Sequence, residues 1–248
     1  MDMQFKEKFV LAWRKYFDEA PLPITFYYSA EAGHAPLAQP GSEARCVMGP
    51  LVKVRNGASL TLAVESVGCF GGKRYLGFDN RLSPNFEFFL SCGIPGQIEG
   101  ERYKKTPELV KALLENWPRF KAPEKYIVFK RWDRLEASDD PAVVIFFARP
   151  DVLAGLFTLA SFDESDPNAV IAPMGSGCSS IVQNPFLEKD REKPRAVIGL
   201  FDPSARPFIA ADELTFALPW AKFVSMVTNM PESFLITRTW ETLRKRIK

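Results

Sequence analysis

Short segments typical of buried strands alternate with segments typical of helices along the whole chain. The strand-like segments are rich in β-branched and aromatic residues and cover residues 24–28, 60–65, 126–129, 142–147, 169–172, 196–201 and 213–218. Apolar periodicity and helix start signals predict helices over residues 5–17, 46–55, 106–117, 151–162, 221–228 and 231–247. No long polar linker divides the chain. The pattern predicts one domain, residues 1–248, of α/β or α+β class, with a mixed sheet layered by helices.

The two halves of the chain show a similar order of segments. In the first half, the strand at 24–28 precedes a helix beginning near Cys46 and then the strand at 60–65. In the second half, the strand at 143–147 precedes a short helix beginning near Cys178 and then the strand at 196–201. The identity between the halves is too low to show a duplication. The order predicts that the two cysteines occupy related places on one sheet.

Composition limits the class of protein. Hydrophobic residues make up 46% of the chain, enough for a full core, and the 13% of aromatic residues fits a bulky core or an aromatic-lined pocket. A net charge of +2 gives no case for a nucleic-acid partner. No stretch approaches the roughly 20 apolar residues of a membrane helix, and the N-terminus lacks the apolar segment of a signal peptide. We therefore expect a cytoplasmic protein with reduced thiols and no membrane contact.

Cys69 lies in a glycine-rich loop after the predicted strand at 60–65. Its neighbours are Gly68, Gly71 and Gly72, followed by the basic pair Lys73 and Arg74. Glycine permits unusual backbone angles or leaves room for a ligand. The basic pair predicts either a lowered thiol pKa or a hold on an anionic ligand. The alternative is a glycine turn with a solvated basic edge.

A second loop of this kind, Gly175-Ser176-Gly177-Cys178, follows the predicted strand at 169–172. If a helix begins at Cys178, the sulfur lies near unpaired backbone N–H groups that favour thiolate over thiol. The same loop would cradle an anion. It is neither a Rossmann nor a P-loop fingerprint, because the third glycine and the Gly-Lys pair are absent. The alternative is a tight strand-to-helix turn with a small buried cysteine.

The remaining cysteines differ from each other. Cys46 lies near a predicted helix start, as Cys178 does, whereas Cys92 follows the aromatic segment 86–90, which we expect to be buried with it. The long intervals between the four cysteines match neither paired zinc-ligand spacing nor the common iron–sulfur spacings. Ligands can still converge from distant loops. An iron–sulfur cluster or another thiolate-bound metal, held by Cys46, Cys69 and Cys178, is therefore one hypothesis.

Other chemistries have weaker signals. A cysteine hydrolase needs a base beside the thiol, and His34, the single histidine, lies in the polar loop 29–42. The chain has no G-x-S-x-G elbow for serine chemistry. Glu65 and Asp202 stand at the ends of predicted strands, where α/β sheets place ligands. Arg206 follows Asp202 closely, either in a salt-bridged turn or as a clamp on a substrate.

Taken together, these segments resemble the family catalogued as domain of unknown function 169. The resemblance covers nearly the whole chain and rests on Phe26-Tyr27-Tyr28-Ser29, Cys46, Cys69-Phe70-Gly71-Gly72 with Leu76-Gly77, Cys178, Arg206 and Asp212-Glu213. Proteins of this family are soluble bacterial and archaeal proteins without an assigned reaction. The resemblance implies that Cys46, Cys69 and Cys178 belong to one shared site, and it names no ligand.

Three hypotheses about function follow. In the first, the protein binds a small-molecule ligand or cofactor at a cleft where the Cys69 and Cys178 loops meet. In the second, it is an enzyme acting on a small anionic substrate, with a thiolate nucleophile and with Lys73, Arg74 or Arg206 holding the anion. In the third, it is an interaction module whose cysteines only pack.

Overall fold

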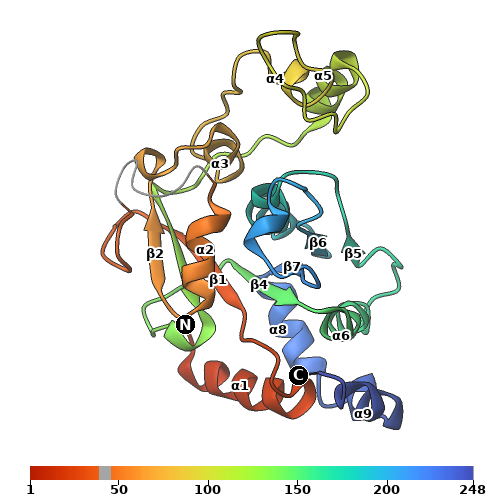
Figure 1. Cartoon of the computed structure of the whole chain (residues 1–248). Helices are drawn as coiled ribbons and strands as arrows, with labels where there is room; N and C mark the ends of the chain where they lie inside the picture. The colour runs from red at the N-terminus through yellow and green to blue at the C-terminus, as the bar shows by residue number, and fades with distance from the viewer. Residues whose placement is uncertain (39–45, 248) are drawn as a thin grey trace.

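Seven strands form one mixed sheet within residues 1–38 and 46–247, the part of the chain that the computed structural model describes (Figure 1). The order across the sheet is β2-β3-β1-β4-β7-β6-β5. The strands are β1 (Ile24–Ser29), β2 (Ser59–Leu62), β3 (Tyr126–Arg131), β4 (Val143–Ala148), β5 (Val170–Ile171), β6 (Ala196–Gly199) and β7 (Leu214–Pro219). Neighbouring strands are antiparallel except for β5 and β6, which are parallel. The predicted fold class, a mixed sheet layered with helices, is confirmed.

The sheet order gives the two halves of the chain corresponding places. β1 and β4 pair at the centre, with Ile24 opposite Ile145. Outward from them lie β3 and then β2 on one side, and β7 and then β6 on the other. The connection from β1 to β2 contains helix α2 (Met48–Arg55). The connection from β4 to β6 contains the π-helix η3 (Ser179–Gln183) and α7 (Asn184–Glu188). Cys46 and Cys178 thus precede corresponding helices, as the order of segments predicts.

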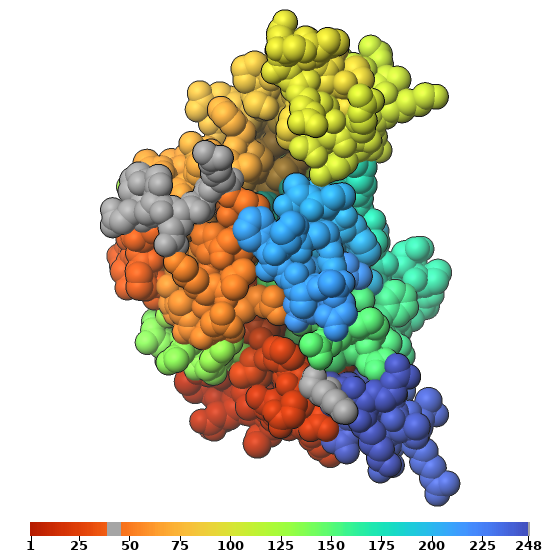
Figure 2. Space-filling view, viewed as in Figure 1, coloured from red at the N-terminus to blue at the C-terminus, as the bar shows by residue number. Residues whose placement is uncertain are grey.

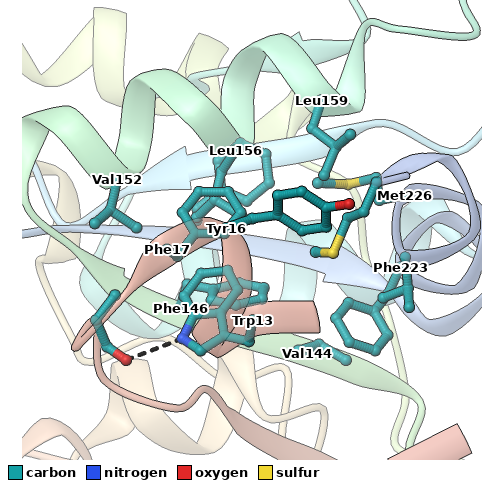
Figure 3. Close-up of a cluster of buried hydrophobic side chains, with 14 of the residues drawn as sticks. Trp13, Tyr16, Phe17, Val144, Phe146, Val152, Leu156, Leu159, Phe223 and Met226 are labelled. Atoms are coloured by element: carbon teal, nitrogen blue, oxygen red, sulfur yellow. Dashed lines mark hydrogen bonds between the residues drawn. The ribbon is translucent and has the colours of Figure 1, made fainter. Parts of the chain in front are cut away.

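The first face of the sheet carries a closed aromatic core. It is covered by α1 (Met3–Phe17), α6 (Pro150–Ala160), α8 (Trp220–Asn229) and α9 (Arg238–Arg244). In Figure 3, Trp13 lies among Phe17, Phe146 and Phe223, and its indole N–H donates to the carbonyl of Ala20 at 2.9 Å. The rings of Trp13 and Phe17 stack with centroids 4.2 Å apart. This face is held by aromatic packing.

The second face carries the thiol-bearing loops. Because side chains alternate along a strand, β4 sends Val144 and Phe146 to the first face and Val143 and Ile145 to the second. The second core is built from α2, η3, α7 and α3 (Phe70–Tyr75), and it includes Cys178 with Cys46 at its margin. The sheet therefore places both cysteines on one side of the molecule.

Residues 79–121 form a lobe beyond α3, with α4 (Phe86–Phe89) and α5 (Pro107–Asn116) (Figure 1). The base of this lobe is joined by a hydrogen bond from Ala122 N–H to the Gly77 carbonyl at 2.8 Å. The prediction of a buried segment at 86–90 is wrong, since no residue of α4 is buried. A lobe this small has little interior. The aromatic side chains of α4 are therefore only partly covered, although α4 packs against α5.

Several predicted boundaries shift. The strand at 60–65 ends at Leu62, and a 3₁₀ turn (Val64–Ser66) follows, so Glu65 does not stand at a strand end. The strand at 196–201 ends at Gly199 because Leu200 has a φ of 64°, which breaks the extended backbone.

At the helix starts and at the C-terminus the predictions also change. Helix α2 begins at Met48 rather than at Cys46, and the helix expected over 231–247 is a 3₁₀ turn (Phe234–Ile236) followed by α9. Residues 39–42 of the predicted polar loop lie outside the described residues. Across the described ranges, no helix has the length and apolar character needed to cross a membrane.

Candidate functional site

The start of α2 touches both glycine-rich loops. A Cβ placed on Gly72 would lie 3.0 Å from Val47 Cγ2 and 3.5 Å from Cys69 Cβ. A Cβ placed on Gly177 would lie 3.6 Å from the Cγ of Met48. Val47 and Met48 directly follow Cys46. The structure therefore gathers the segments of Cys46, Cys69 and Cys178 around one helix start, although they are far apart in sequence.

Cys69 caps the short helix α3. Its Sγ accepts the backbone N–H of Gly72 at 3.4 Å, and the side chain is half-buried. Gly72 is required for this close approach, because a Cβ there would lie 2.8 Å from Val67 Cγ1. Gly71 faces the sulfur more loosely, with a Cβ position 3.7 Å from it. The two glycines let the thiol and the start of α2 come together.

Cys178 is buried and directly precedes the π-helix η3. The neighbouring hydroxyls secure this turn: Ser180 Oγ donates to the Gly177 carbonyl at 2.9 Å, and Ser176 Oγ accepts the Ser179 N–H at 3.3 Å. A Cβ on Gly177 would lie only 2.7 Å from Leu200 Cδ2 and 2.8 Å from Ala205 Cβ. π-Helical turns are rare and occur frequently at functional sites. The Cys178 loop is thus packed tightly against the segment after β6.

That segment brings a carboxylate to the thiols. Asp202 Oδ2 accepts the N–H of Gly177 at 3.2 Å, next to Cys178. Its Oδ1 accepts the N–H of Ser204 at 3.0 Å and the Ser204 hydroxyl at 2.8 Å. Asp202 is half-buried. We refer below to Cys46, Cys69, Cys178 and Asp202 as the thiol site.

The members of the thiol site interact electrostatically. Burial raises the pKa of Cys178 well above its ordinary value, and the negative charges of Cys46, Cys69 and Asp202 raise it further. Burial also raises the pKa of Cys46, where a backbone hydrogen bond from Met48 acts in the opposite direction and the charges of Cys69 and Asp202 add to the rise. Burial raises the pKa of Tyr75, on α3, to about 12; the charge of Arg74 acts in the opposite direction, and the charges of Cys178, Asp202 and Cys69 add to the rise.

The prediction that the helix start favours the Cys178 thiolate is therefore wrong. Desolvation of a buried sulfur disfavours the charged form more strongly than nearby backbone N–H groups favour it. The sequence showed the helix start but not the depth at which the sulfur lies.

Two of the three predicted anion-binding residues, Arg74 and Arg206, are engaged with backbone carbonyls. The guanidinium of Arg206 donates to the carbonyls of Ala211, at 2.6 Å, and of Glu213, so it closes its own loop. Arg74 is buried and donates to the carbonyl of Asn80 at 2.7 Å. Lys73 is half-buried on α3. Arg74 and Arg206 thus donate to the backbone of neighbouring loops.

Sequence reasoning missed the aromatic and amide contacts beside the site. Trp117, at the end of α5, donates its indole N–H to Gln183 Oε1 at 2.8 Å, and Gln183 donates to the carbonyl of Pro118 at 2.8 Å. The Trp117 ring lies over Gly175, and a Cβ placed on Gly175 would be 2.8 Å from Trp117 Cη2. The same ring packs against Tyr75, with ring centroids 5.9 Å apart. The high aromatic content was the only signal for these residues.

The lobe also borders the thiol site near Asp202. The Tyr103 phenol has its pKa raised by partial burial and by the nearby carboxylates of Glu101 and Asp202. In Figure 2, the lobe (yellow) lies against the surface formed by the segment after β6 (blue). The lobe thus reaches the thiol site through Trp117 and Tyr103.

Two residues lie apart from the thiol site. Cys92 is exposed on the lobe, so its predicted burial is wrong, for the same reason as that of segment 86–90. His34 packs its ring edge-on against Tyr27, with centroids 5.7 Å apart, on the segment after β1. Neither residue joins the thiols.

The metal hypothesis needs movement of side chains. Within the described ranges, no group of three or more His, Cys, Asp or Glu side chains is arranged to hold a metal ion. Cys69 is turned toward the Gly72 N–H, and rotation about its Cα–Cβ bond would release the sulfur. Metal ligation by Cys46, Cys69 and Cys178 stays a prediction.

The chain was also compared with known proteins. A search of curated proteins gave no match, and neither did a search of solved structures. The model of the domain of unknown function 169 family (DUF169), described as uncharacterised ArCR, matches residues 10–229. That range includes the thiol site, both glycine-rich loops and the whole sheet. The chain therefore belongs to the DUF169 family.

Proposed function

We propose that this protein binds a small ligand or cofactor at the thiol site, and that a thiolate-bound metal or an iron–sulfur cluster is the class that fits it best. The observation that carries the proposal is the meeting of three thiol-bearing segments around the start of α2. They come from separate connections of the sheet, and glycines at 72 and 177 permit their close approach. A purely structural cysteine needs no such convergence.

The chemistry of the gathered groups favours a cation over an anion. Thiolates are soft ligands that select zinc, copper(I) and iron–sulfur clusters. A bound cation would compensate the mutual repulsion of the thiolates and of the Asp202 carboxylate, and it would deprotonate the thiols on binding. An anionic substrate would add negative charge to a site that already holds thiols and a carboxylate. The guanidinium groups of Arg74 and Arg206 donate to backbone carbonyls instead.

The enzyme hypothesis has less support. A nucleophilic cysteine is typically activated by a lowered pKa or by an adjacent base. Cys46 and Cys178 have raised pKa values, and the charges acting on them from the other site residues are negative. The arrangement therefore supports ligation better than nucleophilic attack.

The test is loading of the protein kept free of oxygen. Protein is purified anaerobically, and its metal content and visible absorbance are measured before and after reconstitution with ferrous iron and sulfide. We expect stoichiometric iron with thiolate-to-iron absorbance in the wild type, and loss of most bound iron in Cys46→Ser, Cys69→Ser and Cys178→Ser.

Cys92→Ser is the matched control, because Cys92 is an exposed thiol on the lobe. It should load as the wild type does. A wild-type protein that stays colourless and free of metal, with and without reconstitution, would contradict the proposal. Rapid alkylation of a single thiol in that protein would instead favour the enzyme hypothesis.

A further inference from the structure

We infer that Arg74 binds an oxyanion, a carboxylate or phosphate group, through the edge of its guanidinium that carries Nε and Nη2. The site lies where α3 joins the lobe, on a side chain that is not part of the thiol site. The inference goes beyond the proposed function and is independent of it, because it requires neither a metal nor a thiolate.

A comparison of the buried cations in the described part of the chain carries the first step. Three basic side chains are buried there, Lys130, Lys222 and Arg74, with 2%, 4% and 5% of their surface exposed. Lys130 pairs with Asp139 at 3.0 Å, and Lys222 pairs with Glu164 at 2.9 Å. Arg74 forms no ion pair with a described carboxylate. Because a buried charge without a counter-charge is costly, an external anion would stabilise Arg74 as the internal carboxylates stabilise the two lysines.

The hydrogen bonds of Arg74 show which edge of the guanidinium would hold the anion. Nη1 donates to the carbonyl of Asn80 at 2.7 Å. The Nε–H is buried and has no acceptor among the described residues, and Nη2 donates to none of them either. A buried polar group without a partner indicates a ligand, an ion or a water. The N–H bonds of Nε and Nη2 point in nearly parallel directions, so this edge matches two oxygens of one carboxylate or phosphate group.

The carboxylate nearest to Arg74 in sequence is engaged elsewhere. Asp79 Oδ2 accepts hydrogen bonds from the exposed guanidinium of Arg81, at 2.7 Å from Nε and 2.6 Å from Nη2. Asp79 Oδ1 accepts the backbone N–H of Arg81 at 2.9 Å. Lys73, next to Arg74, adds a further positive charge. The charge balance where α3 joins the lobe therefore favours an anionic ligand over a cationic one.

The backbone around Arg74 is held in place by several hydrogen bonds. The Arg74 carbonyl accepts the N–H of Gly77 at 3.0 Å, and the Gly77 carbonyl accepts the N–H of Ala122 at 2.8 Å. The hydroxyl of Tyr28 donates to the Leu76 carbonyl at 2.9 Å. A side chain that is buried and fixed in this way loses little freedom on binding, which favours affinity for a ligand as small as an oxyanion.

The experiment titrates the full, metal-free chain with acetate, inorganic phosphate and selenate at constant ionic strength, followed by calorimetry and thermal unfolding. The variants are Arg74→Lys, which keeps the charge but not the two-pronged edge, and Arg74→Met, which removes the charge. Arg238→Lys, at an exposed arginine on α9, is the matched control. Wild-type crystals soaked in selenate locate the anion through the anomalous scattering of selenium.

We expect saturable binding of one oxyanion per wild-type chain, with selenium beside Nε and Nη2 of Arg74. Arg74→Lys should bind about tenfold or more weakly, because it loses the paired hydrogen bonds. Arg74→Met should not bind, and without an oxyanion it should be at least as stable as the wild type, since it buries no unpaired charge. Arg238→Lys should match the wild type. A preference for acetate or for phosphate identifies the group.

Two results would overturn the inference. One is a wild type that binds none of the three anions saturably or holds selenium only away from Arg74, and the other is unchanged binding in both Arg74 variants. If an Arg74 variant does not fold, the selenium position in the wild type decides. Iron loading of the thiol site is measured separately, so failure of this inference leaves the proposed function standing.

Discussion

The two faces of the central sheet are packed by different means. On the first face, α1, α6, α8 and α9 close over β4 with large aromatic rings, among them Trp13, Phe17 and Phe146 (Figure 3). On the second face, the cover is made of shorter pieces, including a π-helix, and it contains thiols and borders a carboxylate. Both faces are packed with aromatic side chains, and the second face additionally holds the polar thiol site.

Glycine shows the same contrast. Gly155 on α6 lies beneath Trp240 and Phe17, where a Cβ would be 2.3 Å from Trp240 Cη2 and 2.7 Å from Phe17 Cε1. There the glycine makes room for rings. Gly177 makes room for Leu200 and Ala205, and through them it brings the Cys178 loop to Asp202. One kind of residue serves packing on one face and site assembly on the other.

The largest expected effect is on the aromatic face. Trp13→Ala removes a fully buried indole and its hydrogen bond to Ala20, and it leaves a cavity under α1. We expect the free energy of unfolding to fall by about 3–5 kcal/mol, measured by urea denaturation of the metal-free protein. The amount of metal bound per folded molecule should not change. A fall smaller than about 1 kcal/mol would show that this face is loosely packed.

A smaller effect separates the two glycines. Gly155→Ala pushes a methyl group into two rigid rings and should cost about 1–3 kcal/mol, partly offset by about 1 kcal/mol of better helix propensity, without changing metal loading. Gly177→Ala meets the flexible side chain of Leu200 but also the Cβ of Ala205, which cannot rotate away, so it should cost a comparable amount of stability. In addition it should impair loading, because it displaces the N–H that Asp202 accepts. Denaturation and metal analysis of both variants test this. Normal loading of Gly177→Ala would remove the contrast.

The smallest expected effect is on the alkylation rates of the cysteines and not on the free energy of unfolding. In the metal-free protein at pH 8, alkylation should modify the exposed Cys92 first and Cys178 last. Cys178 is buried, and because its pKa is raised, its reactive thiolate forms only at higher pH than that of an ordinary cysteine. Its rate should therefore keep rising with pH beyond the pH at which the rate of an ordinary cysteine levels off. Mass spectrometry of the modified peptides measures both rates.

Loading with iron and sulfide sharpens the same measurement. Cys46, Cys69 and Cys178 should become protected while Cys92 reacts as before. Unfolding in urea should bring all four thiols to similar rates. Fast reaction of Cys178 in the folded, metal-free protein would contradict the burial on which its raised pKa depends.

Local sequence predicted much of the architecture. The apolar run at 142–147 became β4 within one residue, since a short run of β-branched and aromatic residues favours a strand in almost any surroundings. The order of segments in the two halves predicted the corresponding places of Cys46 and Cys178. The glycines beside Cys69 and Cys178 marked the places where segments approach closely. Each of these features depends on neighbours within a few residues.

Other features depended on contacts between distant segments. Nothing near Cys92 distinguishes a buried aromatic run from one on a small exposed lobe, and nothing near Arg206 shows that its guanidinium turns back to its own loop. The raised pKa of Cys178 also depends on groups more than 20 residues away.

The sequence by itself determined the alternation of strands and helices, the similar order of segments in the two halves and the presence of thiols in glycine-rich loops. Only the tertiary structure decided that Asp202, and not Arg206, lies beside the thiols, and that burial raises the pKa of Cys178. The physical reason is that backbone conformation follows from short-range steric and hydrogen-bonding preferences. Burial, charge environment and side-chain direction follow from packing across the sheet.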